Sequence, residues 1–280
     1  LSHRGSQDRS IGQPLMRLSR PAKITLGLLT AMTLAFIYLP LGVVLINSFN
    51  ASKNMSWPPK EFTTHWWQVA SQNSAMLKAL GTSILVASAS ALIALILGTL
   101  LALAMSRYKF FGKQPVSLMV ILPIALPGIV TGIALNNAFR TLLGVKLTII
   151  TLIVAHATFC IVTVYNNALA RLNRMNRNME EASADLGAGI WTTFRLVTLP
   201  QMASALVAGA LLAFALSFDE IIVTTFTAGG GVETLPIWIL NNMFRPGKAP
   251  VVDVVAVVVV LISVIPIYLA QRLTAAERTN

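Results

Sequence analysis

The chain has 280 residues, of which 55% are hydrophobic and only 11% are charged, and its mean hydropathy is +0.73. A soluble domain of this length carries about 25% charged residues, so the composition excludes an ordinary soluble protein and predicts an integral membrane protein. The net charge of +11 does not indicate nucleic-acid binding, because the basic residues lie between apolar segments, where they orient membrane helices. The single cysteine, Cys160, excludes a disulfide within the chain.

Six apolar segments are long enough to cross the hydrocarbon core of a bilayer, which takes about 20 helical residues. They cover residues 24–46, 82–105, 116–139, 147–170, 201–223 and 251–271. Each is expected to be a helix, since the bilayer core offers no water to pair backbone groups. We therefore predict an all-α membrane protein with a six-span domain at 24–271. A segment at 1–23, whose first 15 residues look like an extension, precedes this domain, and a tail at 272–280 follows it.

Lys and Arg residues are divided unevenly between the two sides that these spans define. If the N-terminus lies inside, the inner segments hold 14 of the 21 basic residues. This bias favours both termini and the 171–200 loop in the cytoplasm. The outer loop at 48–79 carries Trp57, Trp66 and Trp67. These indoles either anchor at the membrane–water boundary or pack against the outer ends of other spans.

The third segment contains two prolines, Pro123 and Pro127. Each removes a backbone donor and tends to kink a helix. The simpler interpretation is a kinked packing helix. The alternative is a broken helix that lines a pathway.

Several catalytic patterns are absent from the sequence. It contains no Gly-x-x-x-x-Gly-Lys-Ser/Thr phosphate loop, so the chain should not hydrolyse ATP. A Gly-x-Ser-x-Gly elbow and a His-Glu-x-x-His zinc helix are also missing. His156 and Cys160 are four residues apart and share one helix face. Two ligands make a poor metal site, so packing with an internal hydrogen bond is favoured and no metal site is predicted.

The polar loop between the fourth and fifth segments predicts a short helix, a tight turn and a second helix. Glycine at position 187 suits the turn because it adopts a positive φ at low cost, and Pro200 suits the first turn of the next span. Small side chains at Ala182 and Ser183 allow close approach of another surface. Three acidic residues are expected to meet basic groups on a partner: Glu180, Glu181 and Asp185.

The spacing in this loop resembles the EAA signature of bacterial ABC-importer permeases. Glu181-Ala182-Ser183 is followed after three residues by Gly187, after nine more by Val197, and then by Leu199-Pro200. Ser183 and Val197 depart conservatively from the Ala and Ile of the signature. The resemblance to spermidine/putrescine-type permeases extends along nearly the whole chain, for example at Ala215-Leu216-Ser217-Phe218-Asp219-Glu220.

The resemblance implies a type I importer permease in a bacterial inner membrane. Its partners would be a second homologous permease, two ATPase subunits that carry ATP and Mg, and a substrate-binding protein outside, in addition to membrane lipid. The chain itself would bind no cofactor. The loop at about 178–199 would transmit ATPase motion to the spans through Glu181, Ala182, Ser183, Asp185, Gly187, Leu199 and Pro200. The implied cargo is spermidine or putrescine, and another amino compound such as 4-aminobutyrate or an aminophosphonate stays open.

Acidic residues near the outer ends of the last two spans are candidates for a pathway that attracts a cationic cargo. Acids in membrane spans usually face a cavity or another helix. Asp219 and Glu220 point about 100° apart on a helix, so only one is expected to face the pathway, and Asp253 would extend the lining. Phe218 and Trp238 are candidates for cation–π contacts, with Phe214 beside them, although packing is the commoner role of such residues.

Two other classes of protein remain as rivals. An ion-coupled secondary transporter would favour inverted repeats with matching broken helices, but only the third segment carries two prolines, and the other half of the chain has no convincing partner for it. A membrane enzyme would need a catalytic constellation, which the sequence does not offer.

Overall fold

The computed structural model describes residues 19–54 and 56–276. Within these ranges the protein is helical, and its only β-pairing is an isolated antiparallel bridge between Asn50 and Phe62. The expected extension at 1–15 and the last four residues of the expected tail lie outside the described residues.

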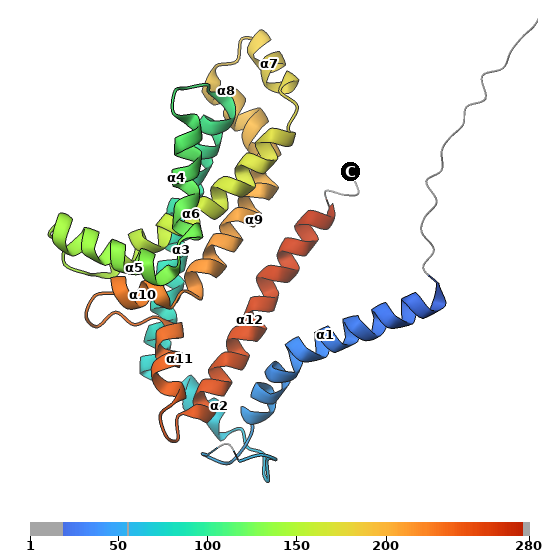
Figure 1. Ribbon diagram of the computed structural model, residues 1–280, viewed down its shortest axis with the longest axis vertical. Helices are drawn as coiled ribbons and strands as arrows, with labels where there is room; N and C mark the ends of the chain where they lie inside the picture. The colour runs from blue at the N-terminus through green and yellow to red at the C-terminus, as the bar shows by residue number, and fades with distance from the viewer. Residues whose placement is uncertain (1–18, 55, 277–280) are drawn as a thin grey trace, which may run out of the picture.

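The helices follow one another in an order that carries the chain back and forth between two ends of the molecule (Figure 1). The long helices are α1 (Arg20–Asn47), α3 (Ser74–Arg107), α6 (Ile149–Arg174), α9 (Leu199–Phe218) and α12 (Ala249–Ala276). One end holds α7 (Asn178–Asp185) and α8 (Ile190–Thr193), and the other holds α2 (His65–Ser71) and α11 (Leu235–Met243). We call the first the loop end and the second the opposite end.

Four helical segments in the described residues are long and apolar enough to cross a membrane. They are α1, α3, α6 and the continuous run Ile190–Phe218, which comprises α8, the π-helical turn η2 (Phe194–Thr198) and α9. A bent pair, residues 113–142, would make a fifth. The expected sixth span falls on α12, a helix of 28 residues that has an apolar stretch at Ala249–Ser263. The apolar helices confirm the membrane class, while the count of six stays a prediction.

The centre of the bundle is formed by α3, α6 and α9, which pack along their lengths. A Cβ on Gly98 of α3 would lie only 2.9 Å from the carbonyl oxygen of Ile161 in α6, so only glycine allows this approach. Ala94 and Ala102, one turn before and after it, are fully buried. Small residues at a helix interface bring backbones together where hydrocarbon supplies no hydrophobic drive.

The third predicted span is broken rather than kinked. Helix α4 (Lys113–Ala125) ends before Pro127, and α5 (Gly128–Asn137) continues at an angle of 107°. Leu126 is extended, with ψ of 143°, because the ring of the following proline disfavours helical backbone at that position. Pro123 lies inside α4 without breaking it. Together with the π-helical turn η1 (Ala138–Leu142), α5 projects to the side of the bundle (Figure 1).

The fifth predicted span also ends earlier than expected. Helix α9 stops at Phe218 rather than continuing to residue 223, and a separate short helix, α10 (Ile222–Thr227), begins after a turn. Glu220 stabilises the start of α10, because its Oε1 accepts a hydrogen bond from the Val223 amide at 2.8 Å. Helix α10 then packs against α5, where Phe226 covers Gly132.

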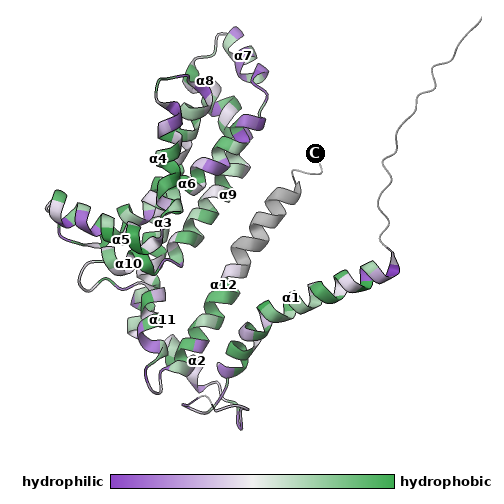
Figure 2. Cartoon of the chain, in the orientation of Figure 1, coloured by the Kyte–Doolittle hydropathy of each residue, from purple (hydrophilic) through white to green (hydrophobic). Residues whose placement is uncertain are grey.

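Helix α1 stands apart from the other helices in Figure 1 and approaches α12 near the opposite end. Its most apolar 18-residue stretch buries none of its residues within the chain. Figure 2 shows hydrophobic residues along most of its length and along the central helices. A helix that is apolar all round belongs in an apolar environment, so the surface of α1 suits lipid or another membrane subunit.

Of the three tryptophans at the opposite end, two pack against other residues and one is exposed. Trp66 is buried and its indole N–H donates to the Asn50 carbonyl oxygen at 2.9 Å, while Trp67 stacks on Phe49. Trp57 is 60% exposed. The packing alternative therefore holds for Trp66 and Trp67, and Trp57 remains available for a boundary.

Candidate functional site

The loop between α6 and α9 has the helix–turn–helix form that its sequence predicts. Helix α7 ends at Asp185, and Gly187 follows with φ of +80°. The Gly187 amide donates to the Ala184 carbonyl at 2.9 Å and the Ala188 amide donates to the Ser183 carbonyl at 3.1 Å. These two bonds form a Schellman motif, in which the left-handed residue closes the helix end. The turn directs the chain back into α8.

A side-chain contact also holds the two short helices together. The hydroxyls of Ser183 and Thr193 are hydrogen-bonded at 3.0 Å, joining α7 to the end of α8. The serine at the position where the EAA signature has alanine therefore serves as an internal brace. Ala182, one residue earlier, is exposed.

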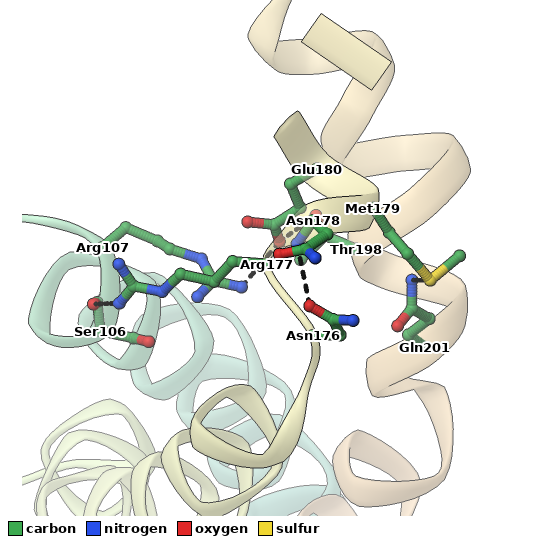
Figure 3. Close-up of polar contacts among 9 residues, drawn as sticks. All are labelled: Ser106, Arg107, Asn176, Arg177, Asn178, Met179, Glu180, Thr198 and Gln201. Atoms are coloured by element: carbon green, nitrogen blue, oxygen red, sulfur yellow. Dashed lines mark hydrogen bonds and ion pairs between the residues drawn. The ribbon is translucent and has the colours of Figure 1, made fainter. Parts of the chain in front are cut away.

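The loop is fixed to the bundle through Glu180. Its Oε1 lies 2.7 Å from an Arg107 guanidinium nitrogen at the end of α3, and it accepts a second bond from the Thr198 hydroxyl at 2.8 Å (Figure 3). Arg177 donates to the Ser106 carbonyl oxygen at 2.9 Å, giving a second link to α3. These bonds connect three segments that are more than 15 residues apart in sequence.

This geometry corrects one expectation. Glu180 does not face a partner, because both of its bonds are made inside the chain, whereas Glu181 and Asp185 are exposed. Sequence reasoning also missed Arg107 and Thr198 as members of the site. The sequence does place Arg107 at the end of an apolar span, which could have indicated an ion pair with an acid of the loop. The loop pattern alone does not show which acid that is.

Large apolar side chains project from the loop. Leu186, Ile190 and Trp191 are 89%, 86% and 71% exposed, and Met179 is also exposed. A loop braced on one side and apolar on the other is suited to dock on another protein, because isolated monomers rarely leave such a patch uncovered.

The chain passes from the loop into α9 through η2. The Leu199 amide bonds to the Phe194 carbonyl, five residues earlier, which is the π pattern. Pro200 has no amide proton, so the usual bond to the Leu196 carbonyl cannot form at this position. Pro200 lies in the first turn of α9, as expected, and α9 continues from α8 through the π turn η2, which accommodates the missing bond.

The candidate pathway residues are divided between two environments. Asp219 is exposed at the end of α9, while Glu220 is half-buried and occupied in capping α10. Phe218 stacks on Phe214 at a centroid distance of 5.8 Å and packs against the buried cluster near α2, α11 and α12. Their role in transport stays a prediction.

Asp253 and Trp238 lie in or beside that same cluster. Trp238 is 4% exposed among Val251, Val254 and other apolar residues, which favours its packing role over contact with a passing cation. Asp253 is half-buried, and its Oδ2 has no hydrogen-bond partner within the described residues. A carboxylate oxygen left in this position is compatible with a pathway role.

His156 is fully buried between α6, α9 and α10. Its Nδ1 lies 2.8 Å from the Ser217 hydroxyl and its Nε2 lies 2.9 Å from the Thr224 hydroxyl. Since Thr224 donates its own proton to the Glu220 carbonyl, it can only accept from the histidine. This assigns the proton to Nε2 and makes Ser217 the donor to Nδ1. Cys160 contacts the Ala213 carbonyl at 3.3 Å, so the pair packs as preferred from sequence.

Comparison with solved structures shows that the fold is shared with bacterial importers. The chain superposes on a bacterial ABC transporter involved in the import of the acidic polysaccharide alginate, with a TM-score of 0.71, 13% identity, and coverage of 90% of this chain and 98% of that one. It also resembles the MetNI methionine ABC transporter, with a TM-score of 0.59, 16% identity, and coverage of 77% and 99%. The fold is that of a membrane permease of ABC importers.

Sequence comparison narrows this class. Residues 94–278 match the protein family described as binding-protein-dependent transport system inner membrane component. The spermidine/putrescine transport system permease protein PotC of Escherichia coli is 35% identical over 91% of this chain and 94% of its own length. The PotC protein of Haemophilus influenzae is 34% identical over 86% and 92%. The putrescine transport system permease protein PotI of Escherichia coli is 33% identical over 80% and 81%.

The chain therefore belongs to the family of binding-protein-dependent transport system inner membrane components. It is a multi-pass inner membrane protein and a transport permease rather than an enzyme.

Proposed function

We propose that this protein forms half of the translocation pathway of an ATP-driven importer for a polyamine such as spermidine or putrescine. A substrate-binding protein delivers the cargo from outside, and a second homologous permease completes the pathway. Two ATPase subunits hold ATP and Mg on the cytoplasmic side. Both termini of this chain lie in the cytoplasm, as its excess of inner basic residues favours.

One observation carries the transport mechanism. The loop formed by α7 and α8 is bound to α3 and η2 on one side and presents Leu186, Ile190 and Trp191 on the other. When a partner ATPase dimer closes, it displaces this patch. The displacement reaches the bundle through the bond between Glu180 on α7 and Arg107 on α3. The α8–η2–α9 run continues the loop directly into a span. The loop can therefore convert motion outside the membrane into motion of the helices.

The cargo assignment is supported by the relatives and by charge. Polyamine permeases match this chain at 33–35% identity over 80–91% of its length. Asp219 is an exposed acid at the end of a span, where it attracts a cation. A second candidate is an aminophosphonate, because the putative 2-aminoethylphosphonate transport system permease protein PhnV of Salmonella paratyphi A is 27% identical over 89% of the chain. 4-Aminobutyrate and an ion-coupled mechanism have no comparable observation in their favour.

Substitution of Gly187 tests the coupling role. Gly187→Trp places a bulky L-residue at φ of +80°, which strains the turn although the space around it is open. Gly189→Trp is the matched control, since it adds the same side chain at a φ of −69° with equally open surroundings. In the reconstituted complex, Gly187→Trp should reduce spermidine uptake at least ten-fold while the subunits remain assembled. Wild-type uptake by an assembled Gly187→Trp complex would remove the coupling role.

Competition distinguishes the two cargo candidates. Unlabelled putrescine should displace labelled spermidine from uptake by the whole transporter, and 2-aminoethylphosphonate should not. Inhibition by the aminophosphonate alone would transfer the assignment to the second candidate.

A further inference from the structure

A cavity of about 560 Å³ lies at the loop end of the bundle, apart from the candidate pathway acids. We call it the inner-end cavity. It is lined by the end of α3, the start of α4, the second half of α6 and the residue preceding α7. The polar groups that matter for its chemistry belong to Ser106, Lys113, Gln114, Tyr165, Asn173 and Arg177.

The lining is basic. Lys113 and Arg177 contribute positive charge, and none of the described residues that line the cavity is acidic. Helix α4 begins at Lys113, has no acidic residue in its first turn and has no side-chain cap from Gly112. Because Lys113 and Gln114 line the cavity, the positive end of the α4 dipole lies beside it and favours an anion. A cationic cargo would be repelled here, so the cavity is not a polyamine site.

Two buried hydroxyls lie behind the wall of the cavity. Tyr165 is only 2% exposed, lines the cavity, and its phenolic oxygen has no hydrogen-bond partner among the described residues. The hydroxyl of Ser106, also in the lining, is buried and similarly unpaired. Buried polar atoms are nearly always hydrogen-bonded in folded proteins. Each of these oxygens has less than 1 Å² of accessible surface, so neither reaches the cavity in this arrangement, and the groups that suit the oxygen atoms of a phosphate are the two cations.

The surroundings decide which phosphate is expected. The segment between α3 and α4 carries Tyr108, 61% exposed, and Phe111, fully exposed, next to Lys113. Aromatic side chains at the ends of spans lie at the headgroup level of a bilayer, and basic pockets between membrane helices on the cytoplasmic side bind anionic headgroups. We propose that the inner-end cavity binds the phosphate group of an anionic phospholipid.

The site also touches the coupling loop. Arg177 lines the cavity, precedes α7 directly, and is bonded to the Ser106 carbonyl on α3. A bound headgroup would therefore hold α7 against α3 and α4. The binding itself does not depend on the cargo or on an ATPase partner, so its failure would leave the proposed transport function standing.

Native mass spectrometry of the full chain in detergent tests the proposal. Phosphatidylglycerol should bind at least five-fold more tightly than zwitterionic phosphatidylcholine. Lys113→Gln should weaken phosphatidylglycerol binding about five-fold, the effect of one basic residue near a membrane surface. Tyr165→Phe, which removes only a hydroxyl that does not reach the cavity, should leave the affinity unchanged. Lys109→Gln is the matched control, because it removes the same charge from an exposed residue of the same segment that does not line the cavity.

Each outcome decides the matter. Equal affinity of the wild type and Lys113→Gln for phosphatidylglycerol would overturn the site. An equal loss of phosphatidylglycerol affinity in Lys109→Gln would show a general attraction to the basic surface and would also overturn the site. Inorganic phosphate is the second arm: if it displaces the lipid completely at low millimolar concentration, the ligand is soluble phosphate and the lipid assignment is wrong. Little displacement supports the lipid.

Discussion

Arg107 and Glu180 lie 73 residues apart in sequence, yet their charged groups meet at 2.7 Å where α3 ends and α7 begins. Their side chains are only 17% and 19% exposed. Two further guanidinium nitrogens of Arg107, Nε and Nη1, are buried without a partner among the described residues. Glu180 is thus the group that compensates a largely buried cation, and the position of the loop depends on it.

Glu180→Gln should lower the stability of the purified protein by about 1–3 kcal/mol, because a charge-assisted hydrogen bond is lost and the arginine stays buried. Arg107→Met in the same background should restore part of that loss, since it removes the uncompensated charge. Thermal unfolding in detergent measures both effects. Glu181→Gln, on the neighbouring exposed acid, serves as the control and should change stability by less than about 0.5 kcal/mol. Additive effects of the Arg107 and Glu180 changes would contradict a direct pair.

His156 offers a second stability test inside the bundle. His156→Leu removes the acceptor of the Ser217 hydroxyl and leaves it buried and unpaired, at a cost of about 1–3 kcal/mol. Thr224 keeps its bond to the Glu220 carbonyl and should contribute little to the loss. Adding Ser217→Ala should therefore recover stability in the His156→Leu background. If the double variant unfolds at a lower temperature than the single one, the assigned hydrogen bonds are wrong.

The parts predictable from sequence are those that local chemistry dictates. Apolar length predicted the C-terminal ends of α3 and α6 to within a few residues, and the Gly187 turn followed from the need for a positive φ. The break at Pro127 was one of two alternatives, because proline permits either a kink or a break until tertiary contacts choose. Here the contact of Gly132 with Phe226 of α10 holds the bent segment.

The parts that sequence missed depend on contacts between distant segments. The apolar run at 201–223 looks continuous, but the Glu220 carboxylate accepts a hydrogen bond from the Val223 amide and stabilises the start of a new helix. The link from Arg107 to Glu180 and Thr198 joins three separate segments, and no local spacing encodes it. The unpaired Tyr165 hydroxyl is visible only once α3, α4 and α6 are assembled.

Membrane orientation can be tested with single cysteines. Ala184→Cys, exposed on α7, should react with an impermeant maleimide only from the cytoplasmic side, and Ser56→Cys, exposed in the outer loop, only from outside. The native Cys160 is fully buried, so it should give little background labelling. Labelling of intact cells compared with inverted membrane vesicles measures the two sides. The reversed pattern would overturn the orientation and the docking side of the ATPase.

Asp219 and Glu220 provide the sharpest test of the polyamine cargo. Asp219 is exposed at the end of α9 with no ion-pair partner among the described residues, whereas Glu220 is bonded to the Val223 amide. A carboxylate beside the pathway lowers the free energy of a polycation there, and desolvation offsets part of this attraction. Asp219→Asn should therefore reduce spermidine uptake about ten-fold to a hundred-fold while thermal stability is unchanged, because shape is retained and charge is removed.

Glu220 should respond differently. Glu220→Gln keeps an oxygen that can accept from the Val223 amide, so it should have little effect on stability, and its effect on uptake should be smaller than that of Asp219→Asn. Glu220→Ala removes the cap of α10 and should cost about 1 kcal/mol in stability. Uptake by the reconstituted complex, with ATPase activity and unfolding temperature measured in parallel, separates transport from folding. Wild-type uptake in both single variants, Asp219→Asn and Glu220→Gln, would show that neither carboxylate assists the cation. The charge argument for a polyamine cargo would then fail.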